Sequence, residues 1–427
     1  MIKIYNTKEI SIENILQREI STADITIEKT VAKILNEVRT NGDKALFEYA
    51  KKFDKVCLTS LAVSKEEIVE GYKNVDKAFI NTLILAKENI EAFHKMQLPK
   101  GFEIKKDNGA AVGQRILPLQ RVGLYVPGGT ACYPSSVLMN AIPAIIAGVK
   151  EIIMVTPPNK EGKIDIKILA AAYILGIEKI YKVGGAQAVG ALAYGTETIP
   201  KVDKIVGPGN AYVANAKKQV YGMVDIDMIA GPSEILIIAD DSANKVYVAA
   251  DMLGQAEHDK NASAVLLTTS INLAKEVQAE LEKQLNTLIR QDIARVSIEN
   301  NGKIIVTEAI EKAIEIANTI APEHLELCID KPLDFLDKIT NAGSVFLGNY
   351  SPEALGDYLA GTNHTLPTGG TARFSSPLSV EDFIKRSQYI YYTKEALSDV
   401  ADDIILFAQR EGLQGHGKSV EVRKQVL

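Results

Sequence analysis

Histidine is the residue type whose use in this chain points most clearly to chemistry. Only five histidines occur among the 427 residues. Four of them, His258, His324, His364 and His416, lie in glycine- or proline-marked segments beside carboxylates or amides, whereas His94 ends a long helical pattern. Imidazole titrates near neutral pH and is the commonest metal ligand. The pattern predicts an enzyme with a metal or proton-transfer site, and a structural role for His94.

Two segments offer distinct functional groups. Gln255 and His258 are three residues apart at the end of a predicted helix, so their side chains share a face. An amide oxygen and an imidazole nitrogen both bind a borderline cation such as zinc, although a solvated helix end is the alternative. Glu323 and His324 follow Pro322 and are bases of different pKa, one able to activate water and one able to relay protons. An exposed, proline-started turn would look the same.

Further acids and histidines lie downstream. Asp357 follows Gly356 and supplies a carboxylate, for which helix capping is the alternative role. For His364 we expect a loop-shaping role through hydrogen bonds. Glu411 and His416 lie in a glycine-punctuated turn that has no reason to hold a core histidine, so we retain both as candidates.

Three glycine-rich segments, 126–130, 183–188 and 205–212, each stand where a predicted strand turns into a helix. Backbone amides at a helix start favour an anionic group. Each segment alone could be ordinary turn chemistry, and Tyr212 occupies the third glycine position of the dinucleotide fingerprint. Three such turns in successive units predict a nucleotide or phosphate site. Cys132 lies near the first turn, and we expect a small buried thiol there, not a nucleophile.

Composition excludes several classes of protein. A net charge of −6 and the absence of a Lys/Arg-rich block argue against a nucleic-acid partner. Three cysteines without a CxxC pattern exclude a disulfide scaffold and a cysteine-type zinc site. The N-terminus has no apolar signal region, and no apolar run is long enough to span a bilayer. We therefore expect a cytoplasmic protein.

The secondary-structure pattern is that of an α/β protein. Helices are expected at 28–53, with a turn at Asn41-Gly42, and at 76–96. From about residue 113, helical segments alternate with apolar runs typical of strands, at 121–126, 151–156, 179–183, 204–206, 234–239, 264–268, 303–306, 325–329 and 344–346. So many strands exceed one open sheet, which predicts two mainly parallel sheets with ligands at the carboxyl ends of strands.

The predicted architecture is two Rossmann-like, incomplete, mainly parallel-sheet domains plus a small helical C-terminal tail domain. The first α/β domain is discontinuous, covering 22–124 and 235–375, and the second covers 125–234 with the glycine loops. An N-terminal segment, 1–21, is expected to pack with the tail, 376–427. In that tail we expect a helix near 380–386, a strand at 389–392, a helix at 394–411 and a polar end. So short a tail must pack on the body or on a neighbouring subunit.

Nine ordered sequence blocks between about Arg121 and Gly417 resemble the histidinol dehydrogenase family. The blocks are RVGLYVPGG, YPSSVLMNAIPA, GGAQAVGALAYGT, KIVGPGNAYV, DMIAGPSEILIIAD, ADMLGQAEHD, IAPEHLEL, GDYLAGTNHTLPTGG and EGLQGHG. Their order and spacing are highly specific, whereas the N-terminal hundred residues add little to the resemblance.

The resemblance implies an enzyme with one Zn²⁺ per subunit that oxidises L-histidinol through L-histidinal to L-histidine with two NAD⁺. It implies a homodimer whose C-terminal tail completes the partner's site. The implied roles are water activation by Glu323 and proton transfer by His324. The implied zinc ligands are Gln255, His258, Asp357 and His416. The implied substrate contacts are Ser233, Gln255, His258, His324, Asp357, Glu411 and His416, and the implied NAD⁺ contacts are Tyr125, Gln187 and Asn210.

Two other classes of protein remain as alternatives. A zinc-dependent hydrolase would use the same ligands with Glu323 as the water base, but it would leave the three glycine loops without a role. A non-enzymatic sugar- or nucleotide-binding protein would not need Glu323 and His324 beside a metal set.

Overall fold

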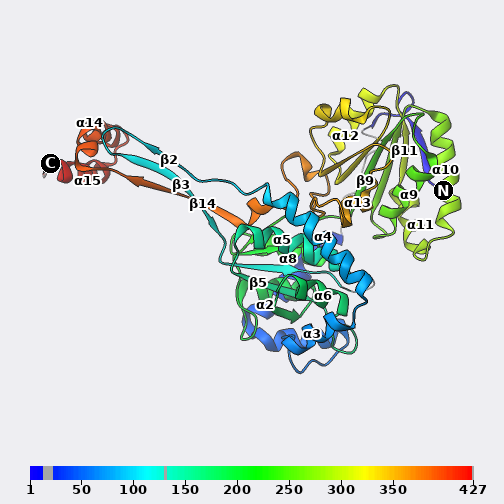
Figure 1. Ribbon diagram of the computed structural model, residues 1–427, viewed down its shortest axis with the longest axis horizontal. Coiled ribbons are helices and arrows are strands. Elements are labelled where there is room, and N and C mark those ends of the chain that lie inside the picture. Colours follow the sequence, from blue (N-terminus) through cyan, green and yellow to red (C-terminus); the bar gives the residue numbers. More distant parts are fainter. Residues whose placement is uncertain (13–22, 129–131, 426–427) are drawn as a thin grey trace. The chain divides into compact units, whose positions relative to one another are not determined.

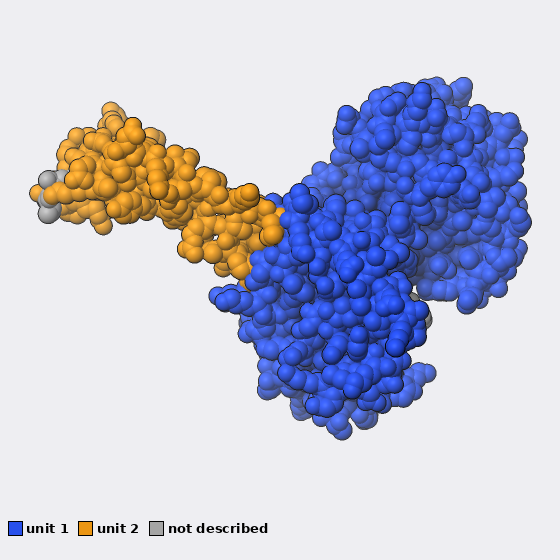
Figure 2. Space-filling view, viewed as in Figure 1, with its two compact units in different colours: residues 1–97, 120–383 blue, residues 98–119, 384–427 orange. Residues whose placement is uncertain are grey.

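The structure, a computed structural model, describes residues 1–12, 23–128 and 132–425. The chain divides into two compact units (Figure 2). Unit 1 comprises residues 1–97 and 120–383, and unit 2 comprises residues 98–119 and 384–427. No helix among the described residues is long and apolar enough to cross a membrane.

Unit 1 contains a six-stranded parallel sheet with the order β1-β11-β10-β9-β12-β13. Figure 1 labels two of its strands, β9 and β11. The strands of this sheet are β1 (Lys3–Asn6), β9 (Glu234–Ala239), β10 (Ser263–Thr268), β11 (Lys303–Val306), β12 (His324–Cys328) and β13 (Ser344–Leu347). Helices α9 (Lys245–Ala256), α10 (Ile271–Leu285) and α11 (Gln291–Asn300) share one buried cluster with alternate strand residues. Helix α12 (Ile310–Ile320) packs with the other set. Both faces are therefore covered, which explains the continuous apolar strands.

Unit 1 also contains a five-stranded parallel sheet with the order β6-β5-β4-β7-β8. Its strands are β4 (Arg121–Tyr125), β5 (Glu151–Thr156), β6 (Lys179–Lys182), β7 (Lys204–Val206) and β8 (Asp225–Ile226). The connecting helices are α5 (Pro134–Ala147), α6 (Ile166–Ile174), α7 (Gly185–Tyr194) and α8 (Ala211–Val220). The chain runs from β4 outward to β6 and then returns to β7 on the other side of β4. The strand order thus reverses between β4 and β7, where open α/β sheets bind ligands.

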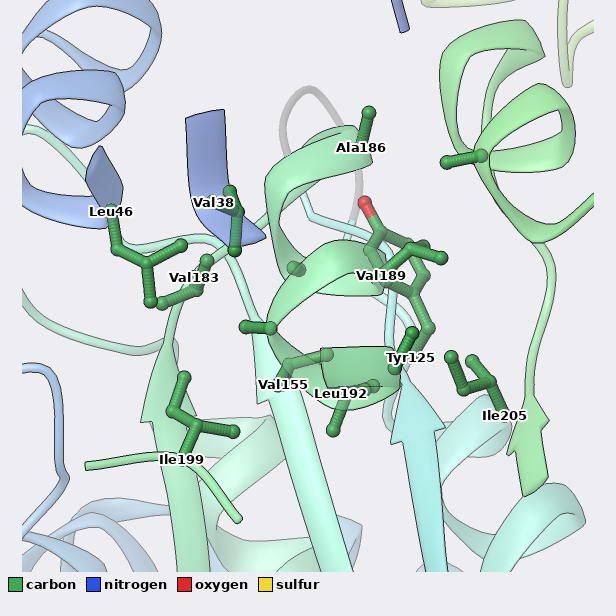
Figure 3. Packing of buried hydrophobic residues seen from close by; sticks show 14 of the residues in the cluster. Val38, Leu46, Tyr125, Val155, Val183, Ala186, Val189, Leu192, Ile199 and Ile205 are labelled. Carbon is green, nitrogen blue, oxygen red and sulfur yellow. The ribbon is translucent and has the colours of Figure 1, made fainter. Parts of the chain in front are cut away.

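The N-terminal helices correct the predicted first domain. They are α2 (Ala23–Tyr49), the π-helical turn η1 (Ala50–Asp54), α3 (Lys65–Asn74) and α4 (Lys77–Lys95). The apolar face of α2, including Val38 and Leu46, packs in one buried cluster with Val183 and Val189 of the five-stranded half (Figure 3). Helices α3 and α4 contact α6 and α5. Segment 23–97 therefore belongs with 125–234, not with 235–375, because α7 is buried all round and needs an apolar cover.

The described part of the N-terminal segment 1–21 joins the six-stranded sheet, and its predicted packing with the tail stays a prediction. Its strand β1 pairs in parallel with β11, from Lys3 against Lys303 to Asn6 against Val306, and so extends the six-stranded sheet. The backbone donors and acceptors along the edge of β11 thereby form hydrogen bonds with β1. Residues 13–21 of that segment lie outside the described residues.

Unit 2 differs from the predicted helical tail. Its three antiparallel strands, β14 (Ile384–Tyr391), β3 (Ala111–Pro118) and β2 (Phe102–Lys105), combine the tail with a hairpin from the N-terminal quarter. The predicted helix near 380–386 is a 3-10 turn, η4 (Val380–Phe383), followed by β14. Helix α14 (Lys394–Arg410) confirms the prediction for 394–411. The stretch expected to be a polar turn is helix α15 (Gln414–Lys424).

Candidate active site

The predicted acid–base residues lie at the amino end of β12, beside the amino end of the neighbouring strand β9. Glu323 directly precedes β12 and His324 begins it, beside Ile235 near the start of β9. These two candidate residues therefore do not lie at the carboxyl ends of strands, where we expected ligands to bind. The reason lies in α9, which returns antiparallel to the strands and brings its C-terminal end, with Gln255 and His258, to their amino ends.

Helical and strand periodicity bring the polar side chains together. His324 and Glu326 alternate with Leu325, which points into the cluster on the α12 side, so both face α9. On α9, Asp251 and Gln255 lie at i and i+4, and His258 lies in the turn two residues past the end of the helix. A short helix after β13, α13 (Glu353–Tyr358), carries Glu353 and Asp357 one turn apart. The elements thus converge on one polar cluster over β12.

Glu323 is a buried carboxyl group with one defined hydrogen bond. Its Oε2 accepts a hydrogen bond from the Glu234 backbone N–H at 2.8 Å. Burial raises the pKa of Glu323 well above its ordinary value, and the nearby charges of Glu234 and Asp357 add to the rise, against the opposing Glu234 hydrogen bond. A carboxyl group with a raised pKa can exchange protons near neutral pH, as a water-activating base must.

His324 is held as a neutral base. Its Nδ1 lies 3.0 Å from the Glu234 carbonyl oxygen, which can only accept, so Nδ1 carries the proton of this hydrogen bond. The free Nε2 faces Glu353, with 3.9 Å between Nε2 and Oε1. Burial lowers the pKa of His324 to about 4, with Asp357 and the hydrogen bond opposing the shift. Nε2 is therefore unprotonated at neutral pH and can accept a proton.

Gln255 connects the base residues to the acidic cluster. In the amide orientation that satisfies hydrogen bonding, Nε2 donates to Glu353 Oε2 at 2.8 Å and Oε1 accepts from the Glu234 N–H at 2.7 Å. In the opposite orientation the amide oxygen faces carboxylate oxygens. A cation placed among these oxygens would favour that second orientation.

Three side chains form a group able to hold a metal ion. His258, Glu353 and Asp357 each offer one ligand atom, and these atoms lie within 4.8 Å of one another. One imidazole nitrogen with carboxylate oxygens suits zinc, and the nearby Gln255 can add an amide oxygen. Residues Gln255, His258 and Asp357 were predicted from the sequence, whereas Glu353 was missed. Its spacing of four residues from Asp357, just after Pro352, is the signal that could have identified it.

Behind this group, the buried Glu326 of β12 attaches α13 to the sheet, with the half-buried Asp251 of α9 beside it. Glu326 Oε1 accepts a hydrogen bond from the Glu353 backbone N–H at 2.9 Å. Asp251 hydrogen-bonds Glu326, and burial raises the pKa of both carboxyl groups, to about 6 for Asp251. The site is consequently supported by buried polar contacts, which restrict where Glu353 can move.

The remaining histidines of unit 1 make structural contacts. His364 approaches the Asp357 carbonyl oxygen through Nδ1 at 3.2 Å and Ser136 Oγ through Nε2 at 3.4 Å. His94 is fully buried and bonds the Ile90 carbonyl oxygen at 2.9 Å. These contacts agree with the loop-shaping and structural roles predicted for the two residues. Burial also raises the pKa of the Cys132 thiol to about 12, which disfavours a thiolate nucleophile there.

Glu411 and His416 belong to unit 2. Glu411 caps the C-terminus of α14, and His416 is the third residue of α15. Both are exposed. Their predicted contacts with substrate and metal stay predictions, as does that of Ser233, which directly precedes β9.

The three predicted cofactor contacts lie at or after the carboxyl ends of three strands of the five-stranded sheet. Tyr125 ends β4, and its hydroxyl oxygen accepts the Gly185 N–H at 3.0 Å. Gln187 is buried in the first turn of α7. Asn210 caps α8 and accepts backbone N–H groups of that helix at 3.0 and 3.2 Å. Tyr125 and Asn210 flank the switch point between β4 and β7. Positions 129 and 130 of the first glycine-rich segment lie outside the described residues.

Comparison with known proteins identifies the family. The family model described as histidinol dehydrogenase matches residues 16–424. The chain is 56% identical over 395 residues to histidinol dehydrogenase of Clostridium acetobutylicum, with 92% of each chain covered. It is 55% identical over 426 residues to that of Streptococcus mutans, with 99% of each covered. The chain belongs to the histidinol dehydrogenase family.

A solved structure of this family supports the same conclusion. The crystal structure of histidinol dehydrogenase from Elizabethkingia anophelis matches with a TM-score of 0.93 and 42% identity, covering 100% of this chain and 98% of the other. The α/β architecture predicted from the sequence is thereby confirmed. As a histidinol dehydrogenase family member, the chain is an oxidoreductase of histidine biosynthesis, and the hydrolase and binding-protein alternatives fall away.

Proposed function

We propose that this enzyme oxidises L-histidinol through L-histidinal to L-histidine, with zinc and two NAD⁺. The observation that carries the proposal is the convergence of Glu323 and His324 on the acidic cluster at the amino ends of β9 and β12. A primary alcohol becomes a carboxylate by loss of two hydrides and addition of one water, with several proton transfers. The reaction therefore needs a reusable base and a water-activating group near one substrate position.

His324 has the features of the reusable base. Its hydrogen bond to the Glu234 carbonyl oxygen keeps the proton on Nδ1 and leaves the Nε2 lone pair toward the cluster. In the first half-reaction Nε2 would take the hydroxyl proton of histidinol as hydride leaves the carbinol carbon. The proton must then pass to solvent before the second half-reaction.

Glu323 is placed to act on water in the second half-reaction. Water adds to the aldehyde carbon of histidinal, and Glu323 would take the proton released from that water. Loss of a second hydride from the resulting hydrate gives the acid. The hydrogen bond from Glu234 N–H leaves Glu323 Oε1 available for this proton. The two bases thus serve different steps.

The donor set fits zinc. Gln255, His258 and Asp357 would hold the ion together with His416, and Glu353 lies within the same group. When bound, zinc would anchor the imidazole and amine of the substrate and polarise nearby oxygens. NAD⁺ would be held by Tyr125, Gln187 and Asn210 and would accept the hydrides. Holding substrate and bases in one geometry can lower the barrier by several kcal/mol.

A homodimer with a shared site is part of the proposal. Unit 2 exposes large apolar side chains, with Phe102 55%, Ile390 77% and Phe407 70% accessible in the single chain. Exposed apolar groups of this size favour burial against another protein surface. A second copy of the chain is the expected partner, and Glu411 and His416 of unit 2 would then contribute to the partner's site.

The test uses purified enzyme supplied with zinc. L-Histidinol and NAD⁺ should yield histidine with two reduced nicotinamides per molecule, measured by absorbance and by product chromatography. Metal analysis should find one zinc per subunit, and a chelator should abolish turnover until zinc is restored. Full activity of the verified metal-free enzyme would overturn the zinc assignment. Failure to reduce NAD⁺ with histidinol would overturn the proposed reaction.

A further inference from the structure

A buried ion pair lies beside the switch point of the five-stranded sheet. Lys217 of α8 and Asp227, which directly follows β8, form the pair, with side chains 2% and 1% exposed. The mechanism described above uses neither residue. Transferring a lysine and an aspartate from water to a protein interior is costly unless each finds several partners. The partners of this pair therefore indicate what it does.

Both members of the pair hold the same residue, Gly207. Lys217 Nζ donates a hydrogen bond to the Gly207 carbonyl oxygen at 2.9 Å. The Gly207 N–H donates to Asp227 Oδ2 at 2.7 Å. The remaining oxygen, Oδ1, accepts the Met228 N–H at 2.6 Å. The peptide groups on both sides of Gly207 are thus fastened by charged partners, which form stronger hydrogen bonds than neutral ones.

Gly207 is the residue at which the chain leaves β7. Its φ of +114° is favourable only for glycine, and a Cβ there would lie 2.1 Å from the Tyr125 carbonyl oxygen. The backbones at the ends of β4 and β7 therefore touch at the switch point. Three residues later, Asn210 caps α8. The position of Gly207 sets the course of loop 207–210 from the sheet to that helix.

We propose that Lys217 and Asp227 are positioning residues for the dinucleotide cofactor, acting through Gly207. The pair holds loop 207–210 so that Asn210, at the start of α8, meets the cofactor without reorganisation on binding. This inference rests on the proposed function, because it assumes that the dinucleotide binds at these loops. A pair that served stability alone could be replaced by apolar side chains without harm to binding.

The experiment compares three variants of the full-length, zinc-loaded enzyme. Lys217→Met removes one charge and leaves Asp227 buried without its partner. The double variant Lys217→Met/Asp227→Asn removes both charges and also the hydrogen bond from Lys217 to the Gly207 carbonyl oxygen. The side-chain amide oxygen at position 227 is then the single acceptor for the two N–H groups, of Gly207 and Met228, that Asp227 accepts in the wild type. Lys204→Met is the matched control, since Lys204 is a buried lysine of β7 that contacts the Asp382 carbonyl oxygen and Asp225 but not loop 207–210.

NADH binding is measured by fluorescence titration without histidinol, and thermal unfolding is recorded for every variant. Lys217→Met should lower the unfolding temperature by roughly 5 °C, because it leaves the Asp227 carboxylate buried without its lysine. Lys204→Met should lower it less, because the neighbouring carboxylate of Asp225 is 50% exposed. The double variant should regain much of that loss. NADH dissociation constants should rise about tenfold in both Lys217 variants and stay within about twofold of wild type in Lys204→Met.

The double variant decides between a positioning role and a purely structural one. A recovered unfolding temperature with persistently weak NADH binding supports positioning. Recovery of NADH affinity together with stability would overturn it, as would equal weakening in Lys204→Met. A steady-state check should show a raised KM for NAD⁺ with a nearly unchanged KM for histidinol. Absence of NADH binding in the wild type would instead refute the cofactor site itself, so the two failures are distinguishable.

Discussion

We expect replacement of Glu323 by glutamine to separate the two proposed half-reactions. Glutamine has nearly the shape of a protonated glutamate, and its amide oxygen can keep the 2.8 Å hydrogen bond from the Glu234 N–H. The substitution therefore removes the ability to take a proton and little else. We expect oxidation of histidinal to histidine to slow strongly, while oxidation of histidinol to histidinal persists.

The size of the effect follows from the role of a positioned base. General-base catalysis contributes about 10²–10⁴-fold, which corresponds to roughly 3–5 kcal/mol in the activation barrier. In the proposed mechanism the first half-reaction uses His324, and the substitution does not alter the Glu234 carbonyl oxygen to which His324 is hydrogen-bonded. The rate of the first half-reaction should change by less than about tenfold, which is the size of effect expected when one charge interaction is lost. The ratio of the two half-reaction rates should thus shift by at least about tenfold.

Stability should respond in the opposite direction from activity. Burial raises the pKa of Glu323 above its ordinary value of 4.5. The folded, metal-free protein then holds a proton that the unfolded chain has lost, so this residue destabilises the fold increasingly as pH rises from 4.5 toward the folded pKa. Glutamine carries no such penalty. In the presence of a chelator, Glu323→Gln should gain unfolding temperature relative to wild type as pH rises.

The assay supplies histidinol or histidinal in separate single-turnover experiments and follows nicotinamide reduction. Glu326→Gln is the matched control, because Glu326 is also a buried glutamate facing α9 and its replacement can still accept the Glu353 N–H. The control should leave the ratio of half-reaction rates unchanged. Equal losses in both half-reactions of Glu323→Gln would refute water activation by Glu323, and a pH-independent stability difference would refute the assigned protonation.

Three further outcomes follow from the structure and the proposed function. Neither His416→Ala subunits nor Glu323→Gln subunits alone should convert histidinol to histidine efficiently, and mixing them should restore part of the histidine formation if unit 2 completes the partner's site. No recovery of histidine formation in verified heterodimers would contradict sharing. Asp357→Asn should weaken zinc binding at least tenfold (about 1.4 kcal/mol) in a competition with a chromogenic chelator, and unchanged affinity would exclude Asp357 as a ligand. Burial lowers the pKa of His94 below its ordinary value of 6.5. As pH falls below 6.5, His94 therefore takes up a proton in the unfolded chain before it does so in the folded protein, and the folded state loses stability. His94→Gln should therefore lose less unfolding free energy between pH 7 and pH 5 than wild type in denaturant titrations, and identical losses would refute this.

Much of the architecture was predictable because it rests on local periodicity. Apolar runs bounded by turns predicted strands β7, β9 and β11 with their observed bounds. The strand-to-helix glycine turns were likewise local features. The packing partners of the N-terminal helices were not predictable in this way. An amphipathic face shows that a helix is covered but not which sheet covers it, so α2 was assigned to the wrong half of unit 1.

The candidate site also combines features that the sequence predicts with features that only the packing of distant segments decides. The types of Gln255, His258, Glu323 and His324 and their short spacings suffice to indicate acid–base and metal chemistry, since those properties belong to the side chains themselves. Only the tertiary structure places these residues at the amino ends of the strands and adds Glu353 to them. It also determines that His324 presents Nε2 as a neutral base.

These features depend on the return direction of α9, on burial and on a carbonyl oxygen ninety residues away in the chain. The sequence by itself therefore determined which chemical groups are available and on which local elements they lie. Their protonation, orientation and mutual distances arise only when distant segments pack, because desolvation and hydrogen bonding act through space and not along the chain.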